Sequence, residues 1–133
     1  MSPEVRPLTI AVDFDGTIVE HRYPAIGKEI PFAFQVLREL QQLGFRLILW
    51  TYRHGEALEA AVAYCRAQGI EFYAVNANHP DEPYDPAQES RKILADVYID
   101  DRNVGGFLGW ATIRNHLLGE GLQAPAKRRW GLF

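Results

Sequence analysis

Cysteine is almost absent from this sequence, since Cys65 is the only one among 133 residues. A single cysteine cannot form a disulfide within the chain, which excludes a disulfide-bonded scaffold and favours a reducing compartment. Cys65 follows Leu58, Ala61 and Val62 in an apolar stretch. We therefore expect it to be packed as a small hydrophobic residue, because a reactive thiolate needs a polar, electropositive setting.

Long apolar runs and an excess of charge of one sign are also missing. No run approaches the roughly 20 apolar residues that a membrane-spanning helix needs, and Met1–Pro7 lacks the basic stretch and apolar core of a signal peptide. The formal net charge of −3 does not favour a nucleic-acid or membrane surface. No two histidines have the spacing of zinc ligands. We expect a cytoplasmic protein without a membrane partner.

What the sequence does contain suits one globular domain. Hydrophobic residues make up 47% and charged residues 23% of the chain. This composition provides enough apolar material for a core that needs no metal or disulfide to fold. There is no internal repeat, low-complexity stretch or linker. We treat residues 1–133 as a single domain, with a motif-bearing core at about 8–118 and a tail at 119–133.

Strand and helix patterns alternate along the chain. Short apolar runs predict four buried strands, at Leu8–Phe14, Arg46–Thr51, Glu71–Asn76 and Ala95–Asp100. Helical spacing predicts helices at Phe32–Leu43 (with Pro31 in its first turn), Glu56–Gln68 and Trp110–Leu118, and a short one at Gln88–Leu94. This alternation predicts an α/β domain of three layers, a parallel sheet with helices on both faces. Ligands of such sheets bind beyond the carboxyl ends of the strands.

Polar residues follow these strand ends. The first strand ends in Asp13-Phe14-Asp15-Gly16-Thr17, the second in Thr51 and the fourth in Asp100-Asp101, with Lys92 shortly before the fourth. If the first and fourth strands are neighbours, the four aspartates converge and repel each other. A hard divalent cation such as Mg²⁺ relieves that repulsion with oxygen ligands. A cation, a lysine and a hydroxyl together make a phosphate site.

Each of these aspartates has a plainer explanation as a helix cap or a turn residue. The joint pattern is more specific than any single aspartate, because chance alone would rarely place polar residues after several strands and a lysine before the last one. A turn at Gly16 would also let the carboxylate of Asp15 swing away from that of Asp13.

With these motifs the chain resembles the haloacid dehalogenase superfamily, whose members are mostly phosphatases. The resemblance covers about Leu8 to Gly106. It is carried by Asp13-Phe14-Asp15-Gly16-Thr17, Leu47-Ile48-Leu49-Trp50-Thr51, Lys92 and Val97-Tyr98-Ile99-Asp100-Asp101. The resemblance implies a Rossmann-like sheet with strand order 4-1-2-3, an aspartyl-phosphate intermediate and Mg²⁺.

The resemblance also implies a role for each matched residue. Asp13 would attack phosphorus and bind the metal, and Asp15 would act as acid and base while its backbone carbonyl binds the metal. Thr51 would hydrogen-bond the phosphoryl oxygens, and Lys92 would neutralise their charge. Asp101 would ligate the metal directly and Asp100 through water.

Larger family members carry a cap domain at two places in the chain, and the corresponding segments are short here. Only Ile18–Ile30 separates the first motif from the first helix, and only Asn76–Arg91 lies between the third strand and Lys92. Neither segment can hold a cap domain, so we expect an open cleft. A homo-oligomer or another partner could cover it.

Several residues beside the motifs are candidates for substrate binding. They are Gly16 and Thr17 of the first motif, Arg22 in the segment after it, Arg53 after Thr51 and Asn76 after the third strand. Arg53 has a guanidinium that suits oxyanions, although a structural ion pair explains it equally well. A solvated loop explains Arg22, and a turn explains Asn76.

The sequence thus predicts a Mg²⁺-dependent phosphatase, with a small phosphorylated molecule preferred over a nucleic acid as the substrate. A nucleic-acid end phosphatase is the alternative enzyme, and Lys127-Arg128-Arg129 beside Trp130 is a basic run that such a partner could contact. A non-catalytic phosphate-binding or regulatory module is a further alternative. A receiver domain is disfavoured, because its phosphorylated aspartate would follow the third strand, which ends here in Asn76.

Overall fold

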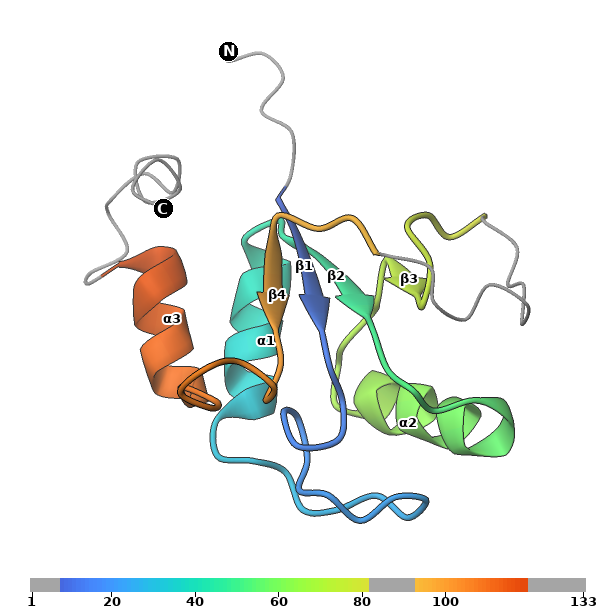
Figure 1. The fold of residues 1–133 in the computed structure, drawn as a ribbon. Helices are drawn as coiled ribbons and strands as arrows, with labels where there is room; N and C mark the ends of the chain where they lie inside the picture. Colours follow the sequence, from blue (N-terminus) through green and yellow to red (C-terminus); the bar gives the residue numbers. More distant parts are fainter. Residues whose placement is uncertain (1–7, 82–92, 120–133) are drawn as a thin grey trace.

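The computed structural model describes residues 8–81 and 93–119 (Figure 1). The chain order is β1 (Thr9–Val12), α1 (Ala33–Gln42), β2 (Arg46–Leu49), α2 (Gly55–Ala67), β3 (Ala74–Val75), β4 (Val97–Ile99) and α3 (Trp110–Leu118). The four strands form one parallel sheet in the order β3-β2-β1-β4. This arrangement confirms the predicted α/β class, the parallel sheet and its strand order.

The register of the sheet aligns the ends of its two central strands with the edge strand β4. Val12 of β1 pairs with Leu49 of β2 on one side and with Ile99 of β4 on the other. The backbone N–H of Asp13 then donates to the Ile99 carbonyl at 3.0 Å, which extends the β1–β4 ladder by one step. The residues that follow β1, β2 and β4 therefore emerge side by side at the carboxyl edge, which is the lower edge in Figure 1.

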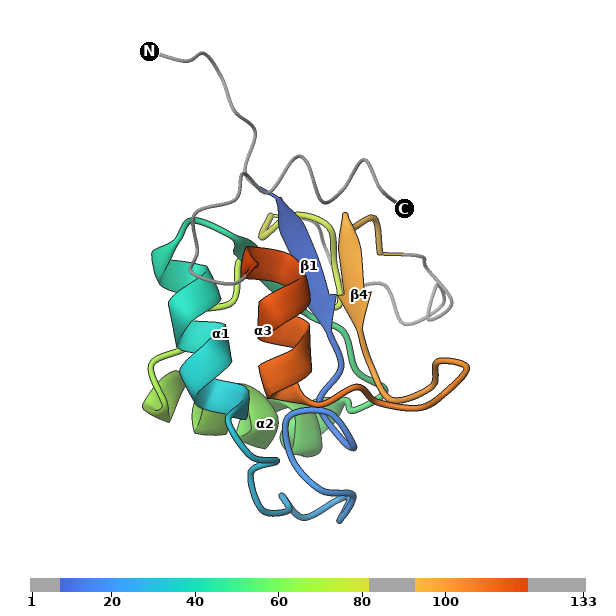
Figure 2. The same cartoon turned by 90° about the vertical axis from the view of Figure 1, so that its left-hand side faces the viewer.

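All three helices that the structure describes pack on the same face of the sheet. One core joins that face to α1, α2 and α3 through Ile10, Val12, Leu47, Leu49, Phe34, Leu37, Cys65 and Trp110. Figure 2 shows α1 and α3 side by side on one side of β1 and β4, and two hydrogen bonds from Arg114 to Glu39, of 2.7 and 2.8 Å, join them. No helix covers the other face within the described ranges 8–81 and 93–119.

The topology explains this one-sided arrangement. The β1–α1–β2 and β2–α2–β3 crossovers advance in the same direction, so their right-handedness places both helices on one face. The described residues on either side of 82–92 lie on the other face, where Ala77 and Ile93 pack on Ala11, Ile48 and Ala74. The helix predicted at Gln88–Leu94 lies mostly in 82–92, outside the described residues, and its described end at Ile93 and Leu94 is not helical.

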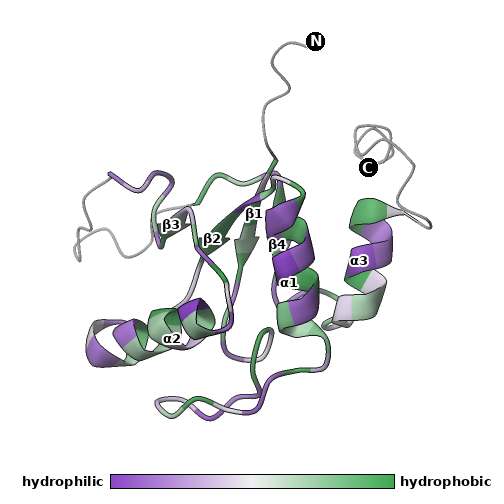
Figure 3. Cartoon of the chain, turned by 180° about the vertical axis from the view of Figure 1, so that it is seen from behind, coloured by the Kyte–Doolittle hydropathy of each residue, from purple (hydrophilic) through white to green (hydrophobic). Residues whose placement is uncertain are grey.

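The start of α1 differs from the prediction. The helix begins at Ala33, so Pro31 and Phe32 precede it, and Phe32 is 56% exposed with φ of 71°. Phe34 is buried instead, and its N–H donates to the Glu29 carboxylate at 3.1 Å. The outer side of α1 is hydrophilic (Figure 3), so the helix has one apolar stripe facing the core.

Cys65 confirms the packing prediction. It is fully buried on α2 in the main core, and burial raises the pKa of its thiol to about 12. No helix of the described ranges is both long and apolar enough to cross a membrane.

Candidate phosphoryl-transfer site

The sheet places three of the predicted aspartates after neighbouring strand ends. Asp13 follows β1, and Asp100 and Asp101 follow the neighbouring strand β4. The pKa of the Asp13 carboxyl is raised to about 7, mainly by burial and in smaller part by the charges of Asp101, Asp100 and Asp15, while a hydrogen bond from the Phe14 N–H acts to lower it. The predicted convergence of carboxylates therefore has an electrostatic consequence at Asp13.

The raised pKa of Asp13 makes the stability of the metal-free protein depend on pH. The ordinary pKa of 3.8 rises to about 7 on folding, so the folded state keeps a proton that the unfolded state releases. The contribution of Asp13 to the free energy of unfolding is fully present below pH 3.8 and is lost as pH rises through about 7. Urea unfolding in EDTA should show a loss on the order of 1–3 kcal/mol between pH 5 and pH 8, which Asp13→Asn removes. An equal pH dependence in both proteins would contradict this assignment.

The turn after Asp13 brings the flap, defined as Ile18–Ile30, against Asp101. Gly16 has φ of +86°, and a Cβ there would lie 2.2 Å from Oδ2 of Asp101 and 2.4 Å from Nε2 of His21. Those two atoms are themselves 3.1 Å apart. A side chain at position 16 would force both apart, so Gly16 contributes space and backbone freedom to the site. The contact of His21 with Asp101 was not predicted, since nothing in the sequence indicates that the flap folds back this far.

Asp15 forms a partly buried ion pair with Arg53. The Nε of Arg53 donates to Oδ2 of Asp15 at 2.8 Å, and its Nη2 donates to Oδ1 at 2.7 Å. Arg53 is 2% exposed, and its other hydrogen bonds go to the carbonyls of Pro24, Ala25 and Ala57. Of the two predicted roles for Arg53, substrate ligand and structural ion pair, the structure shows the ion pair.

Thr51 and Asn76 meet at the ends of β2 and β3. The Thr51 N–H donates to Oδ1 of Asn76 at 2.8 Å, and the Arg53 N–H donates to Oγ1 of Thr51 at 3.1 Å. Asn76 has φ of 51°, the left-handed region that asparagine tolerates in turns. The turn explanation therefore accounts for Asn76, while the hydroxyl proton of Thr51 remains able to donate to a phosphoryl oxygen.

The remaining candidates are placed less favourably for binding. Thr17 is fully buried, and within the described part of the chain its hydroxyl has no hydrogen-bond partner. Its carbonyl accepts a 2.8 Å hydrogen bond from the indole of Trp110, so α3 anchors the first motif. Arg22 is exposed and donates to the His21 carbonyl at 3.0 Å. Lys92 and the tail residues Lys127–Phe133 lie outside the described residues.

The fit of a magnesium ion can be judged from the donor atoms. Asp13, Asp100, Asp101 and the Asp15 carbonyl offer oxygen only, which suits Mg²⁺. Within residues 8–81 and 93–119, however, no three His, Cys, Asp or Glu side chains stand together in positions that could hold a metal. His21 occupies one oxygen of Asp101. The donor chemistry therefore fits Mg²⁺, and the contact with His21 leaves Oδ1 of Asp101 as the oxygen that would bind it.

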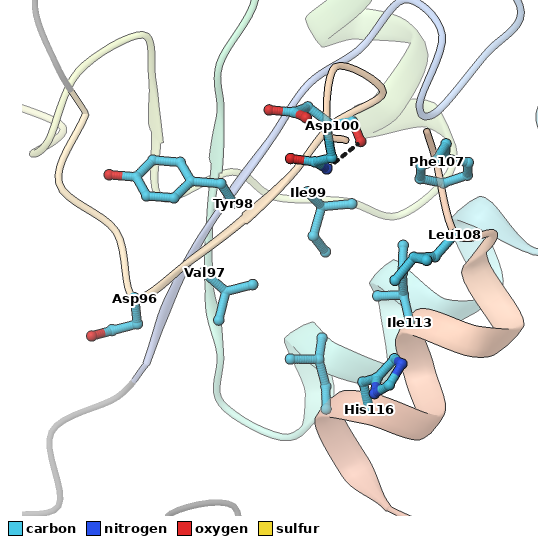
Figure 4. Close-up of a pocket in the computed structure, with 11 residues that line it drawn as sticks. Asp96, Val97, Tyr98, Ile99, Asp100, Phe107, Leu108, Ile113 and His116 are labelled. Carbon is cyan, nitrogen blue, oxygen red and sulfur yellow. Dashed lines mark hydrogen bonds between the residues drawn. The ribbon is translucent and has the colours of Figure 1, made fainter. Parts of the chain in front are cut away.

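A cavity of about 460 Å³ lies beside this cluster, between β4 and α3 (Figure 4). Apolar side chains dominate its lining, among them Val97, Ile99, Leu108 and Ile113. It meets the acidic cluster through Asp100, whose backbone carbonyl accepts a hydrogen bond from Asn103. Asp13, Asp15 and Thr51 are not part of its lining, so the cavity touches the candidate site only at Asp100.

No protein-family model and no curated protein matches this sequence. Among solved structures, the chain matches one described as that of a conserved protein coded by a locus of Bacteroides thetaiotaomicron. The two sequences are 57% identical and the TM-score is 0.73. The match covers 83% of this chain and 88% of the Bacteroides protein.

Proposed function

We propose that this chain, which belongs to the same family as the conserved Bacteroides thetaiotaomicron protein, is a phosphatase of the haloacid dehalogenase type. The reaction is hydrolysis of a phosphoric monoester through an aspartyl phosphate on Asp13. The observation that carries this proposal is the position of Asp13 at the carboxyl edge of β1, between the acidic end of β4 and the hydroxyl of Thr51 after β2.

The geometry around Asp13 supports a nucleophilic role. Its Oδ1 accepts the Phe14 N–H at 2.8 Å, which fixes the carboxylate and leaves Oδ2 for in-line attack on phosphorus. Attack forms the Oδ2–P bond and breaks the bond from phosphorus to the leaving oxygen. Water then hydrolyses the acyl phosphate and restores the carboxylate, so one hard displacement becomes two easier ones.

The neighbouring groups complete the proposed chemistry. Asp15 donates a proton to the leaving oxygen and later accepts one from the attacking water. Thr51 donates its hydroxyl proton to a phosphoryl oxygen at the end of β2. Lys92, outside the described residues, would supply positive charge. Asp13, Asp101, the Asp15 carbonyl and, through water, Asp100 would hold Mg²⁺, which neutralises charge on the carboxylates and the phosphoryl group when it is bound.

The surroundings of the site support a substrate that enters from open solvent. Between Asp13 and α1 the chain forms only the flap, which is paired at its base by the hydrogen bonds from Ile30 to Ile18 and from Glu20 to Lys28. The flap residues from Glu20 to Ala25 are exposed. No cap domain is present in the described ranges. The second insertion point, at Asn76–Arg91, lies partly outside them.

Phosphate release from a substrate panel tests this proposal. The purified protein is incubated with small phosphate esters and with oligonucleotides carrying a 3′- or 5′-phosphate, in Mg²⁺ and in EDTA. We expect release from small esters in Mg²⁺, loss of that release in EDTA and its recovery when Mg²⁺ is returned. Release from oligonucleotides alone would favour the end-phosphatase alternative. No release from any member of the panel, or full turnover in excess EDTA, would refute the mechanism.

A further inference from the structure

We infer that Arg53 is a positioning residue that ties the Asp15 carboxylate to the flap, so that the position of the flap sets where this carboxylate points. This inference rests on the proposed function, in which Asp15 is the acid and base. It gives the flap a part in the reaction cycle besides substrate contact.

The hydrogen bonds of Arg53 occupy its whole guanidinium group. A guanidinium has five N–H donors, and five acceptor contacts are formed by Asp15 and by the carbonyls of Pro24, Ala25 and Ala57. The ring centroids of Phe14 and Tyr23 lie 4.9 and 5.1 Å from its central carbon. Arg53 therefore has no donor left for a phosphoryl oxygen in this conformation.

The same hydrogen bonds limit what Asp15 can do. Both of its carboxylate oxygens accept N–H groups from Arg53. Arg53 therefore fixes the direction in which the Asp15 carboxylate points, while each oxygen keeps a second lone pair that can carry the proton for the leaving group. The proposed mechanism uses Asp15 twice, so the orientation that Arg53 gives it bears on both proton transfers.

The flap is joined to this pair through a shared nitrogen. Nη2 of Arg53 donates to Oδ1 of Asp15 at 2.7 Å and to the carbonyl of Ala25 at 2.7 Å, while Nη1 donates to the carbonyl of Pro24 at 3.0 Å. A displacement of the flap tip pulls on the nitrogens that hold Asp15. Tyr23 is 53% exposed over one side of the guanidinium, so a substrate that contacts this ring can shift the flap and loosen the pair.

Two readouts distinguish this role from a purely structural ion pair. The first is hydrogen exchange of the flap amides, which needs no activity. The second is the ratio of kcat for an alkyl phosphate to kcat for p-nitrophenyl phosphate, because only the alkyl leaving group needs a proton from Asp15. A structural ion pair would affect stability and leave this ratio unchanged. If Arg53 were instead a substrate ligand, replacing it would raise KM for both compounds.

The test compares Arg53→Met with a matched control, Arg114→Met. Arg114 makes a comparable two-point pair with Glu39 between α3 and α1, and that pair includes no residue of the site. We expect Arg53→Met alone to speed exchange within residues 18–30. It should lower the kcat ratio by roughly 10- to 100-fold, part of the 10²–10⁴-fold that general acid–base catalysis contributes, with KM changed less than about threefold. Arg53→Lys should restore part of the ratio.

A double variant separates failure of this inference from failure of the proposed function. With Asp15→Asn present, adding Arg53→Met should not change the kcat ratio further, because the group that Arg53 positions is gone. If Arg53→Met does not fold, Tyr23→Ala removes only the exposed ring over the guanidinium and should give the same pattern at smaller size. Unchanged flap exchange, or a raised KM with an unchanged ratio, would overturn the inference. A wild-type protein without phosphatase activity would refute the proposed function, and flap exchange would still decide whether Arg53 holds the flap.

Discussion

Asp13→Asn is expected to abolish phosphatase turnover and to leave no phosphate on the protein. An asparagine side chain keeps the oxygen that accepts the Phe14 N–H, so the loop after β1 should hold its shape. The carboxamide has no anionic oxygen to attack phosphorus, and losing a nucleophile costs roughly 10⁴-fold or more in kcat. The measurement is steady-state phosphate release in Mg²⁺, with the folded state checked by thermal melting.

The matched control for this variant is Asp96→Asn. Asp96 lies just before β4, at the opposite edge of the sheet, where its Oδ2 accepts the Thr9 N–H at 2.8 Å. Asparagine can keep that hydrogen bond, so activity should stay near the wild-type level. Wild-type activity in Asp13→Asn would remove Asp13 from the mechanism. Phosphate recovered on a serine, on a histidine or on the buried Cys65 would do the same.

The sheet could be predicted from the sequence because each strand is indicated by a short run of consecutive residues. Runs such as Leu8–Phe14 and Ala95–Asp100 are apolar over both faces of a strand, and this pattern is typical of parallel strands. The observed strands lie inside these runs but are shorter at both ends. Once β1 and β4 are neighbours, backbone geometry alone brings Asp13 to the acidic end of β4. The core of the candidate site therefore follows from the pattern and the topology.

The side chains that surround this core could not be predicted in the same way. An arginine two residues after Thr51 has the same sequence pattern whether it faces a substrate or turns back to Asp15. The choice depends on the carbonyls of Pro24 and Ala25, which lie 29 and 28 positions away along the chain. The contact of His21 with Asp101 spans 80 positions. Such contacts depend on where a loop returns, and neither propensity nor periodicity carries that information.

The first residue of α1 could not be predicted from the sequence pattern either. Phe32 and Phe34 both fit a helical apolar pattern ending at Leu40, and a shift of two residues changes which phenylalanine is buried. The structure selects Phe34 because the Glu29 carboxylate accepts its N–H and the helix begins after Phe32. Helix ends depend on such capping contacts, and the capping group here comes from the flap.

Asp15→Asn should separate the two halves of the proposed reaction. The variant keeps Asp13 as nucleophile and the backbone carbonyl of residue 15 as a metal ligand, but it loses proton transfer. For an alkyl phosphate we expect kcat to fall by roughly 10²–10⁴-fold, the usual contribution of general acid–base catalysis. For p-nitrophenyl phosphate the fall should be smaller, because p-nitrophenolate leaves almost without a proton. The introduced carboxamide can keep only part of the contact with Arg53, so a stability loss of about 1–3 kcal/mol is also expected.

The decisive measurement on Asp15→Asn is its intact mass after quenching in acid during turnover of p-nitrophenyl phosphate. Attack by Asp13 should outpace hydrolysis of the acyl phosphate, because no base at position 15 activates the water. A phosphorylated protein should therefore accumulate, with the phosphoryl group on Asp13. Glu39→Gln is the matched control, since it weakens the pair with Arg114 away from the site and should neither lose activity nor trap phosphate. Equal losses for both leaving groups with no trapped phosphate would remove Asp15 from the acid and base role and leave Arg53 holding a residue without a catalytic function.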